Sequence, residues 1–195
     1  MKNLFPILLI LSAAGISLFL LKDQFLGSSS THEVSAVGDP SASAGSKEKF
    51  DYLAAQTGNT CGLQLSTVSN YSDDRRVQGS CCSKMDFHGY QEQVEGLKKF
   101  KDLPFIPSDP YDISGAQAKQ LFSFLENIEL NPAQQAIYNE AAKISDEGGP
   151  CCCKCWHWDA YEGLAKKLIV DYDWGAQQIA ELWDLSSACG GTHDG

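Results

Sequence analysis

Apolar residues recur every three or four positions through most of the chain after residue 46, which is the spacing of one face of an α-helix. Within residues 47–57, for example, Phe50, Leu53 and Ala54 share one face. The helices predicted in this way begin near Lys47, Ser83, Ser114, Asn131, Trp158 and Gly175. The pattern therefore predicts an all-α domain, a helical bundle of about six helices.

Capping residues support several of these boundaries. Ser114 with Gln117, and Asn131 with Gln134, have the spacing in which a short polar side chain and the third helical residue cap a helix start reciprocally. Residues 83–86 have the same spacing, with Asp at the last position. No stretch shows a convincing alternation of polar and apolar residues bounded by hairpin turns, so a sheet is not required.

An apolar run at residues 4–21 precedes this domain. Its length of about 18 residues is near the lower limit for crossing ~30 Å of hydrocarbon, so it is either a signal peptide or a single membrane anchor. Residues 22–26 lack the small residues of a cleavage site, and we favour an uncleaved anchor within residues 1–26. Lys2 and the terminal amine predict a cytoplasmic N-terminus, with the rest of the chain outside.

The composition divides the remaining chain into two parts. Residues 27–46 are rich in Ser, Thr, Gly and Pro and predict a flexible linker. Residues 47–195 then form the helical, cysteine-rich domain. We expect this domain to be membrane-anchored and extracytoplasmic, in a periplasm or at the cell exterior. If the N-terminal segment is cleaved, the domain is secreted instead.

Charge and composition exclude several classes of function. The net charge is −10 and the pI is near 4.7, which argues against nucleic acid as a partner because phosphate binding needs clustered cations. Hydrophobic residues make up 43% and charged residues 21%, so the chain as a whole has an ordinary globular composition. No G-x-S-x-G, H-E-x-x-H or P-loop pattern is present, and enzymatic activity is not the first expectation.

Eight cysteines are the unusual feature of the composition, and four of them lie within residues 151–155. In an extended conformation Cys151, Cys153 and Cys155 point to one side. In the first turn of a helix Cys151 and Cys155 stack at positions i and i+4, with Cys152 nearby. Either conformation brings three or four sulfur atoms together.

Thiolate sulfur is a soft ligand that selects Cu(I), Zn(II) or an iron–sulfur cluster. The spacing C-C-C-x-C matches none of the common zinc-finger or ferredoxin patterns. The motif therefore indicates sulfur chemistry without specifying the ion, and His157, two residues after the last cysteine, is a further candidate ligand.

A second cluster occupies residues 81–88. On a helix, Cys81, Met85 and His88 lie along one face, which brings a thiol, a thioether and an imidazole together beside Cys82. Such a set suits a soft ion such as copper. The alternative is that Met85 fills the core and His88 is an ordinary surface residue.

Disulfide bonds are the structural alternative for an exported chain. Each cysteine of residues 151–155 could pair with one of the four that lie elsewhere, and each bridge would add about 2–4 kcal/mol of stability. Bridges and a metal can also share the set, with Cys61 and Cys189 as a possible disulfide and both clusters left free for an ion.

Residues 138–191 resemble the exported bacterial proteins named for a PCYCGC motif, which are often lipoproteins. The family's proline and three alternating cysteines correspond to Pro150, Cys151, Cys153 and Cys155. Cys152 and Lys154 stand where the family has Tyr and Gly, and this chain has no cysteine for lipid attachment near its N-terminus. The resemblance implies an exported protein, a helical tail after the motif and binding of a metal.

The sequence therefore predicts a membrane-tethered, extracytoplasmic protein that binds a soft metal ion, copper first and zinc second. The predicted ligands are Cys151, Cys152, Cys153, Cys155, Cys81, Cys82 and His88. Two alternatives remain at this point: a thiol–disulfide oxidoreductase, and a disulfide-stabilised interaction module without chemistry. The predicted partners are the membrane and the metal ion.

Overall fold

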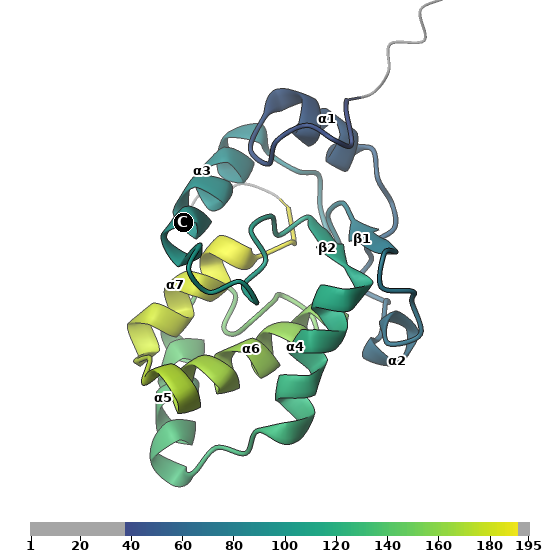
Figure 1. Cartoon of the computed structure of the whole chain (residues 1–195). Helices are drawn as coiled ribbons and strands as arrows, with labels where there is room; N and C mark the ends of the chain where they lie inside the picture. Colours follow the sequence, from purple (N-terminus) through teal and green to yellow (C-terminus); the bar gives the residue numbers. More distant parts are fainter. Residues whose placement is uncertain (1–37, 191–195) are drawn as a thin grey trace, which may run out of the picture. The chain divides into compact units, whose positions relative to one another are not determined.

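The computed structural model describes residues 38–190 and shows a mainly helical fold (Figure 1). Its elements, in chain order, are α1 (Lys47–Ala54), α2 (Leu65–Val68), β1 (Arg76–Gln78), α3 (Phe87–Leu97), the 3-10 helix η1 (Lys98–Phe100), β2 (Asp112–Ser114), α4 (Gly115–Asn127), α5 (Pro132–Ile144), α6 (Trp156–Tyr172) and α7 (Ala176–Ser186). The prediction of a mostly helical domain is confirmed for these residues.

The predicted caps of α4 and α5 are both present. The Ser114 hydroxyl accepts a hydrogen bond from the Gln117 amide, and the Gln117 side chain accepts one from the Ser114 amide. Asn131 and Gln134 form the same reciprocal arrangement at the start of α5, with Pro132 in its first turn. Because these caps satisfy amides that have no partner inside the helix, the sequence defines both starting points.

The predicted helix start at residue 83 is wrong. Residues 81–86 are bends and irregular chain, and α3 begins only at Phe87. The Asp86 carboxylate caps it by accepting a hydrogen bond from the Gly89 amide at 2.7 Å. Asp86 is itself the N-cap, a position that aspartate and serine both favour. Cys81 and Met85 therefore do not share a helix face with His88.

Residues 59–80, where no helix start is predicted from the sequence, contain helix α2 and strand β1. Strand β1 pairs with β2 in an antiparallel ladder, in which Arg76 lies opposite Ser114 and Val77 opposite Ile113. Each strand is only three residues long, so it is too short to show alternation in the sequence. Strand β2 directly precedes α4, so the ladder fixes the start of that helix against residues 76–78.

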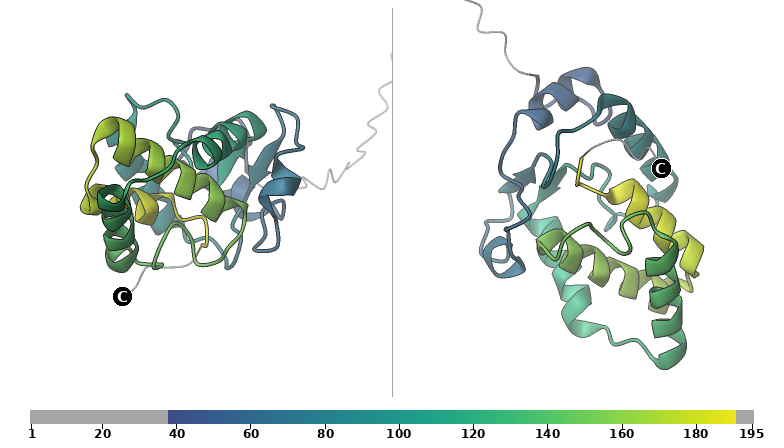
Figure 2. Two further views of the ribbon diagram at one scale, coloured as in Figure 1. Left: turned by 90° about the horizontal axis from the view of Figure 1, so that it is seen from below. Right: turned by 180° about the vertical axis from the view of Figure 1, so that it is seen from behind.

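Helices α4 and α6 pack against each other and supply much of the main hydrophobic core (Figure 1). Their backbones approach closely at Gly163, where an added Cβ atom would collide with the Leu121 carbonyl oxygen. Leu164 and Leu168 of α6 are fully buried. Helix α7 packs against α5 and α3, and Figure 2 shows the loop before α6 running beside the segment that follows α7.

A smaller hydrophobic cluster joins α1 and α3 around Leu53, Tyr90 and Val94. Beside it, the buried Asp112 carboxylate receives a hydrogen bond from Lys49 at 2.6 Å and forms a second ion pair with Arg76. Burial raises the pKa of Asp112, but the hydrogen bonds from Arg76 and Lys49 outweigh it, so the pKa lies below its ordinary value. This network fixes α1 to the two-stranded ladder.

The N-terminal predictions fall mostly outside the described residues. The proposed anchor at 1–26 and the first part of the proposed linker lie there. Residues 38–46 form turns: the Asp39 amide donates to the Glu48 carbonyl at 3.0 Å, and the Gly45 amide donates to the Tyr90 hydroxyl at 3.1 Å. Within residues 38–190, no helix has the length and apolar character needed to cross a membrane.

Candidate metal centre

Four segments that are far apart in the sequence bring the cysteines together. They are the loop before α2, the bends after β1, the bends before α6 and the segment after α7. Within the described residues every cysteine is a free thiol, and the cysteines are Cys61, Cys81, Cys82, Cys151, Cys152, Cys153, Cys155 and Cys189.

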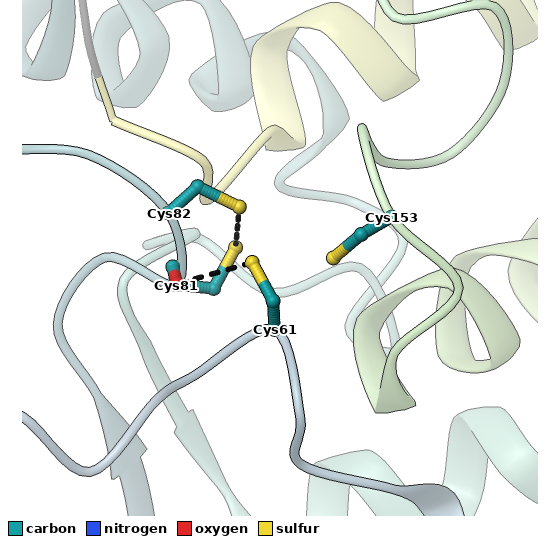
Figure 3. A group of neighbouring side chains, drawn as sticks. All are labelled: Cys61, Cys81, Cys82 and Cys153. Carbon is teal, nitrogen blue, oxygen red and sulfur yellow. Dashed lines mark hydrogen bonds between the residues drawn. The ribbon is translucent and has the colours of Figure 1, made fainter.

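Seven of these cysteines form three groups in which the sulfur atoms all lie within 4.8 Å of one another. We call them the outer group (Cys61, Cys81, Cys82, Cys153), the inner group (Cys81, Cys151, Cys152, Cys153) and the C-terminal group (Cys81, Cys82, Cys152, Cys189). Figure 3 shows the outer group, in which Cys153, on the bends before α6, points toward the other three cysteines. The site is therefore one continuous sulfur cluster.

The shortest sulfur–sulfur distances connect the segments across the cluster. The Cys82 sulfur lies 3.1 Å from that of Cys152 and 3.3 Å from that of Cys81. The Cys189 sulfur lies 2.7 Å from that of Cys152, 3.5 Å from that of Cys151 and 4.0 Å from that of Cys81. Four sulfurs around one tetrahedral ion, each at ~2.3 Å from it, lie about 3.8 Å apart. The spacing in the cluster is compatible with such an ion after small shifts.

Backbone hydrogen bonds fix the segment after α7 against the bends after β1. The Cys81 amide donates to the Ala188 carbonyl at 2.9 Å, and the Ser83 amide donates to the Cys189 carbonyl at 2.8 Å. The Ser83 hydroxyl also donates to the Cys189 carbonyl at 2.9 Å. Gly190 follows with φ of +72°, where a side chain would collide with Ser80 and the Ser83 carbonyl. These contacts hold Cys81 and Cys189 in a fixed relation.

A buried asparagine connects the other segments. The Asn59 side chain donates to the Gly79 carbonyl at 3.1 Å and accepts from the Trp156 indole at 2.9 Å. The Trp156 amide donates to the Leu63 carbonyl at 2.9 Å. Since Asn59 is 3% exposed and fully engaged, it ties the loop that carries Cys61 to both neighbouring segments.

Exposure changes across the cluster. Cys151 and Cys155 are fully buried and Cys189 is 4% exposed, so these three form a floor within the main core. The other cysteines lie nearer the surface: Cys81 and Cys153 are partly exposed, and Cys61, Cys82 and Cys152 are exposed. An ion thus has access from one side, while the far side excludes water.

The pKa values of the cysteine thiols shift in opposite directions. Hydrogen bonds from Cys151 and Cys81 lower the pKa of Cys155 far below its ordinary value, and the same two thiols lower the pKa of Cys189. The pKa of Cys81 is raised, first by its hydrogen bonds to Cys151, Cys155 and Cys189 and then by burial. The thiols therefore differ in how readily they lose a proton, and a bound ion must displace the protons of its ligands.

The predicted conformation of residues 151–155 is wrong in both of its forms. These residues are successive bends, and α6 starts at Trp156 with Cys155 as the residue before it. The bends give the cysteines different exposure, since Cys151 is buried and Cys152 is exposed, but they keep the sulfurs of Cys151, Cys152 and Cys153 together in the inner group. Pro150 and the preceding glycines predict the end of regular structure after α5, but they do not predict the path of the chain that follows.

The predicted ligands Cys81, Cys82, Cys151, Cys152 and Cys153 all belong to the sulfur groups. Cys155 is not a member of any of the three groups and is fully buried in the main core.

Cys61 and Cys189 were predicted as a possible disulfide. The structure places them in different groups, the outer and the C-terminal, as free thiols. The sequence connects them to the site only by number, because each of the four cysteines within residues 151–155 could pair with one of the four that lie elsewhere.

The histidines and Met85 lie apart from the sulfur groups. His88 is exposed on α3, where its Nε2 atom is 3.3 Å from Glu92, and Met85 packs at the edge of the smaller hydrophobic cluster. His157 is completely buried and stacks on Tyr161 with ring centroids 4.3 Å apart. Burial lowers the pKa of His157, and neither ring nitrogen makes a hydrogen bond of normal geometry with a described residue. The imidazole is therefore neutral and belongs to the core.

No protein-family model, no curated protein and no solved structure matches this chain.

Proposed function

We propose that this protein binds a soft metal ion through its clustered cysteine thiolates, with copper as Cu(I) the first candidate and zinc the second. The observation that supports this most is the convergence of cysteines from four separate segments into one sulfur cluster. Each of the three groups offers sulfur ligands alone, without a carboxylate or an imidazole. A set of this kind favours soft ions over Mg²⁺ or Ca²⁺, which prefer oxygen.

The shape of the cluster favours Cu(I) over Zn(II). Structural zinc sites hold four ligands in a closed tetrahedron, usually from two pairs with regular spacing. Here the three groups overlap and their members differ in burial, from exposed Cys61 to buried Cys151. Cu(I) accepts two or three thiolates in irregular arrangements, and the buried floor protects it from water and oxidants. Binding and handing on of the ion is the role that follows.

The cellular setting is part of the proposal and rests on the sequence. The apolar run at 4–21 supports tethering to a membrane, with the cysteine domain outside the cytoplasm. The motif around Pro150 supports membership of the exported PCYCGC-motif proteins. In such a compartment a bound metal would also protect the thiols from oxidation.

The test is metal content and thiol count on the full chain, purified without oxygen from its native compartment. We expect three or more free thiols after metal removal and a bound soft ion before it. The variant Cys151→Ser/Cys153→Ser/Cys155→Ser should lose the ion, while His88→Ala, a control outside the cluster, should keep it. A wild-type chain that retains no metal and takes up neither Cu(I) nor Zn(II) would overturn the proposal.

One observation favours thiol–disulfide exchange as a second candidate. The sulfur atoms of Cys152 and Cys189 lie 2.7 Å apart, with Cys152 exposed and the pKa of Cys189 lowered by its hydrogen bonds from Cys151 and Cys81. Oxidation would join the two sulfurs while two electrons and two protons pass to the disulfide of a partner protein, which becomes a dithiol. Loss of two hydrogen masses on mixing with a model disulfide, blocked by Cys152→Ser, would support it. Zero free thiols and no metal in the native chain would support the interaction module instead.

A further inference from the structure

The three sulfur groups are not separate sites, because they share members. Cys81 belongs to all three groups, and each of Cys82, Cys152 and Cys153 belongs to two. Any two groups have two sulfurs in common. Filling one group with an ion therefore uses ligands that the other two groups need.

We propose that the cysteines hold more than one metal ion in a single polynuclear thiolate cluster, in which the Cys81 sulfur bridges the ions. The inference rests on the proposed soft-metal function and goes further by assigning the number of ions and the role of one ligand. The three groups define up to three ion positions, and with three thiolates around each ion the seven sulfurs supply them only if some thiolates bind two or three ions at once.

Thiolate sulfur is suited to bridging. It carries three lone pairs and is polarizable, so it can bind a second soft ion after the first with little loss of donor strength. Cu(I) takes few ligands, and three thiolates around each ion are enough. Overlapping four-sulfur groups at these distances therefore favour shared ligands over one ion that leaves most of the cluster protonated.

Charge favours sharing as well. Three thiolates around a single Cu(I) leave two uncompensated negative charges, and a buried charge without compensation is costly. A thiolate that bridges two ions contributes its one negative charge to both of them. The negative charge per ion therefore falls as the cluster fills. This matters most at the buried floor of Cys151, Cys155 and Cys189.

Cys81 has the position that a bridging ligand needs. Its sulfur lies 3.3 Å from that of Cys82 at the exposed side and 4.0 Å from that of Cys189 at the floor. It also lies within 4.8 Å of the Cys151 and Cys152 sulfurs in the inner group. Its amide is fixed to the Ala188 carbonyl, so the sulfur is held between the exposed and the buried cysteines.

The binding step involves no oxidation or reduction. Each Cu(I) delivered by a chelator forms Cu–S bonds, and every thiol that becomes a ligand releases one proton to the solvent, so the ion stays Cu(I). The first ion draws shared sulfurs together and removes their protons. Later ions then bind to sulfurs that are already in place, so filling should be cooperative.

The test is a titration of the full, reduced chain with Cu(I) in competition with a coloured Cu(I) chelator, without oxygen, followed by native mass spectrometry. We expect the wild-type chain to pass from the empty form to one with up to three ions, with little of the single-ion form. X-ray absorption of the loaded chain should show scattering of one copper by another.

Two cysteine variants distinguish a bridging ligand from a terminal one. Cys81→Ser removes the member common to all three groups and should lose at least two of the ions. Cys61→Ser, the control, removes an exposed member of the outer group alone and should lose at most one. If far-ultraviolet circular dichroism shows that Cys81→Ser is unfolded, Cys82→Ser decides, because in separate sites no single substitution can remove more than one ion.

The outcomes separate this inference from the proposed function. A wild-type chain that saturates with one ion, or variants that each lose the same single ion, would overturn the shared cluster while leaving soft-metal binding intact. Failure of the wild-type chain to bind either Cu(I) or Zn(II) would overturn both. Loss of two or more ions on one substitution, together with copper–copper scattering, would establish the bridge.

Discussion

The four helices from α4 to α7 and the sulfur cluster are held in place by different kinds of interaction. The helices lie where apolar periodicity and caps place them, and buried side chains such as Leu164 and Ile179 hold them together. The cysteines lie on bends and loops, which hydrogen bonds to backbone carbonyls hold in place. Stability thus resides mainly in the helical region and chemistry in the irregular segments, as is common for sites carried on a rigid framework.

The two regions also differ in the interactions that stabilise them. A buried leucine needs only its apolar neighbours and contributes about 1.5–3 kcal/mol through burial. A buried thiol that hydrogen-bonds weakly to other thiols gains less, and the cluster reaches a full set of strong interactions only when its sulfurs bind an ion. The helical region should therefore fold without metal, and the sulfur region should depend on it.

Leu164→Ala gives the largest expected effect and tests the independence of the two regions. Leu164 is fully buried on α6, so the substitution leaves a cavity and should lower the free energy of unfolding by about 2–5 kcal/mol. Urea unfolding with and without Cu(I) measures this, and the loss should be similar in both. The control Ile144→Ala, at a residue 44% exposed, should cost well under 1 kcal/mol. A loss that disappears on metal loading would show that the regions are coupled.

The helical region is also the one that the sequence predicts. Ser114 and Asn131 mark the starts of α4 and α5 correctly, because capping is a local interaction between residues three positions apart. The start of α3 was misplaced, since Ser83 and Asp86 are both capping residues and the sequence does not decide which one acts. The short strands β1 and β2 were missed because their pairing is fixed by tertiary contacts, which include the ion pair of Arg76 with Asp112.

The sulfur cluster could be predicted only in part. The membership of most cysteines in the cluster follows from their concentration at residues 151–155 and 81–82. The inclusion of Cys61 and Cys189 depends on contacts between distant segments, such as the hydrogen bonds of Asn59 with Gly79 and Trp156. Such convergence has no local signature, and no periodicity applies to cysteines on bends.

Metal binding gives the next largest effect and sharpens the contrast. An ion that binds only the folded chain stabilises it by about 4 kcal/mol when its free concentration is 1,000 times its dissociation constant. We expect the thermal midpoint of the wild-type chain to rise on adding chelator-buffered Cu(I). The Cys151→Ser/Cys153→Ser/Cys155→Ser variant should show no rise. An equal rise in both chains would place the ion outside the cluster.

Acid should weaken the attachment of α1 without involving the cysteines. The pKa of Asp112 is lower in the folded chain than the value of about 3.9 in unfolded chains. Its carboxylate therefore stabilises the fold fully above about pH 4, and this contribution is lost as the pH falls through the lower, folded-state pKa. We expect Asp112→Asn to cost about 1.5–3 kcal/mol at neutral pH, the usual value of hydrogen bonds to a charged group.

The measurement is urea unfolding of both chains between pH 7 and pH 2. The difference between wild type and Asp112→Asn should shrink as the pH falls below about 4 and disappear below the lower pKa of the folded state, where the wild-type carboxylate is protonated and no longer pairs with Lys49 or Arg76. A difference that stays constant down to pH 2 would mean that the ion pairs contribute little. Cu(I) stoichiometry at neutral pH should be equal in the two chains, since Asp112 is not part of any sulfur group.

His88→Ala is the smallest expected effect, and it marks the boundary of the sulfur region. The imidazole is 81% exposed on α3 and pairs with Glu92 in the next turn, an interaction worth about 0.3–0.5 kcal/mol at most when the histidine is charged. We expect the free energy of unfolding to change by less than about 0.5 kcal/mol and the Cu(I) stoichiometry and affinity to stay the same. A tenfold weaker affinity for Cu(I) would show that α3 turns its first residues toward the sulfurs when the ion binds. The histidine predicted from the sequence would then belong to the site, and the irregular segments alone would no longer account for the chemistry.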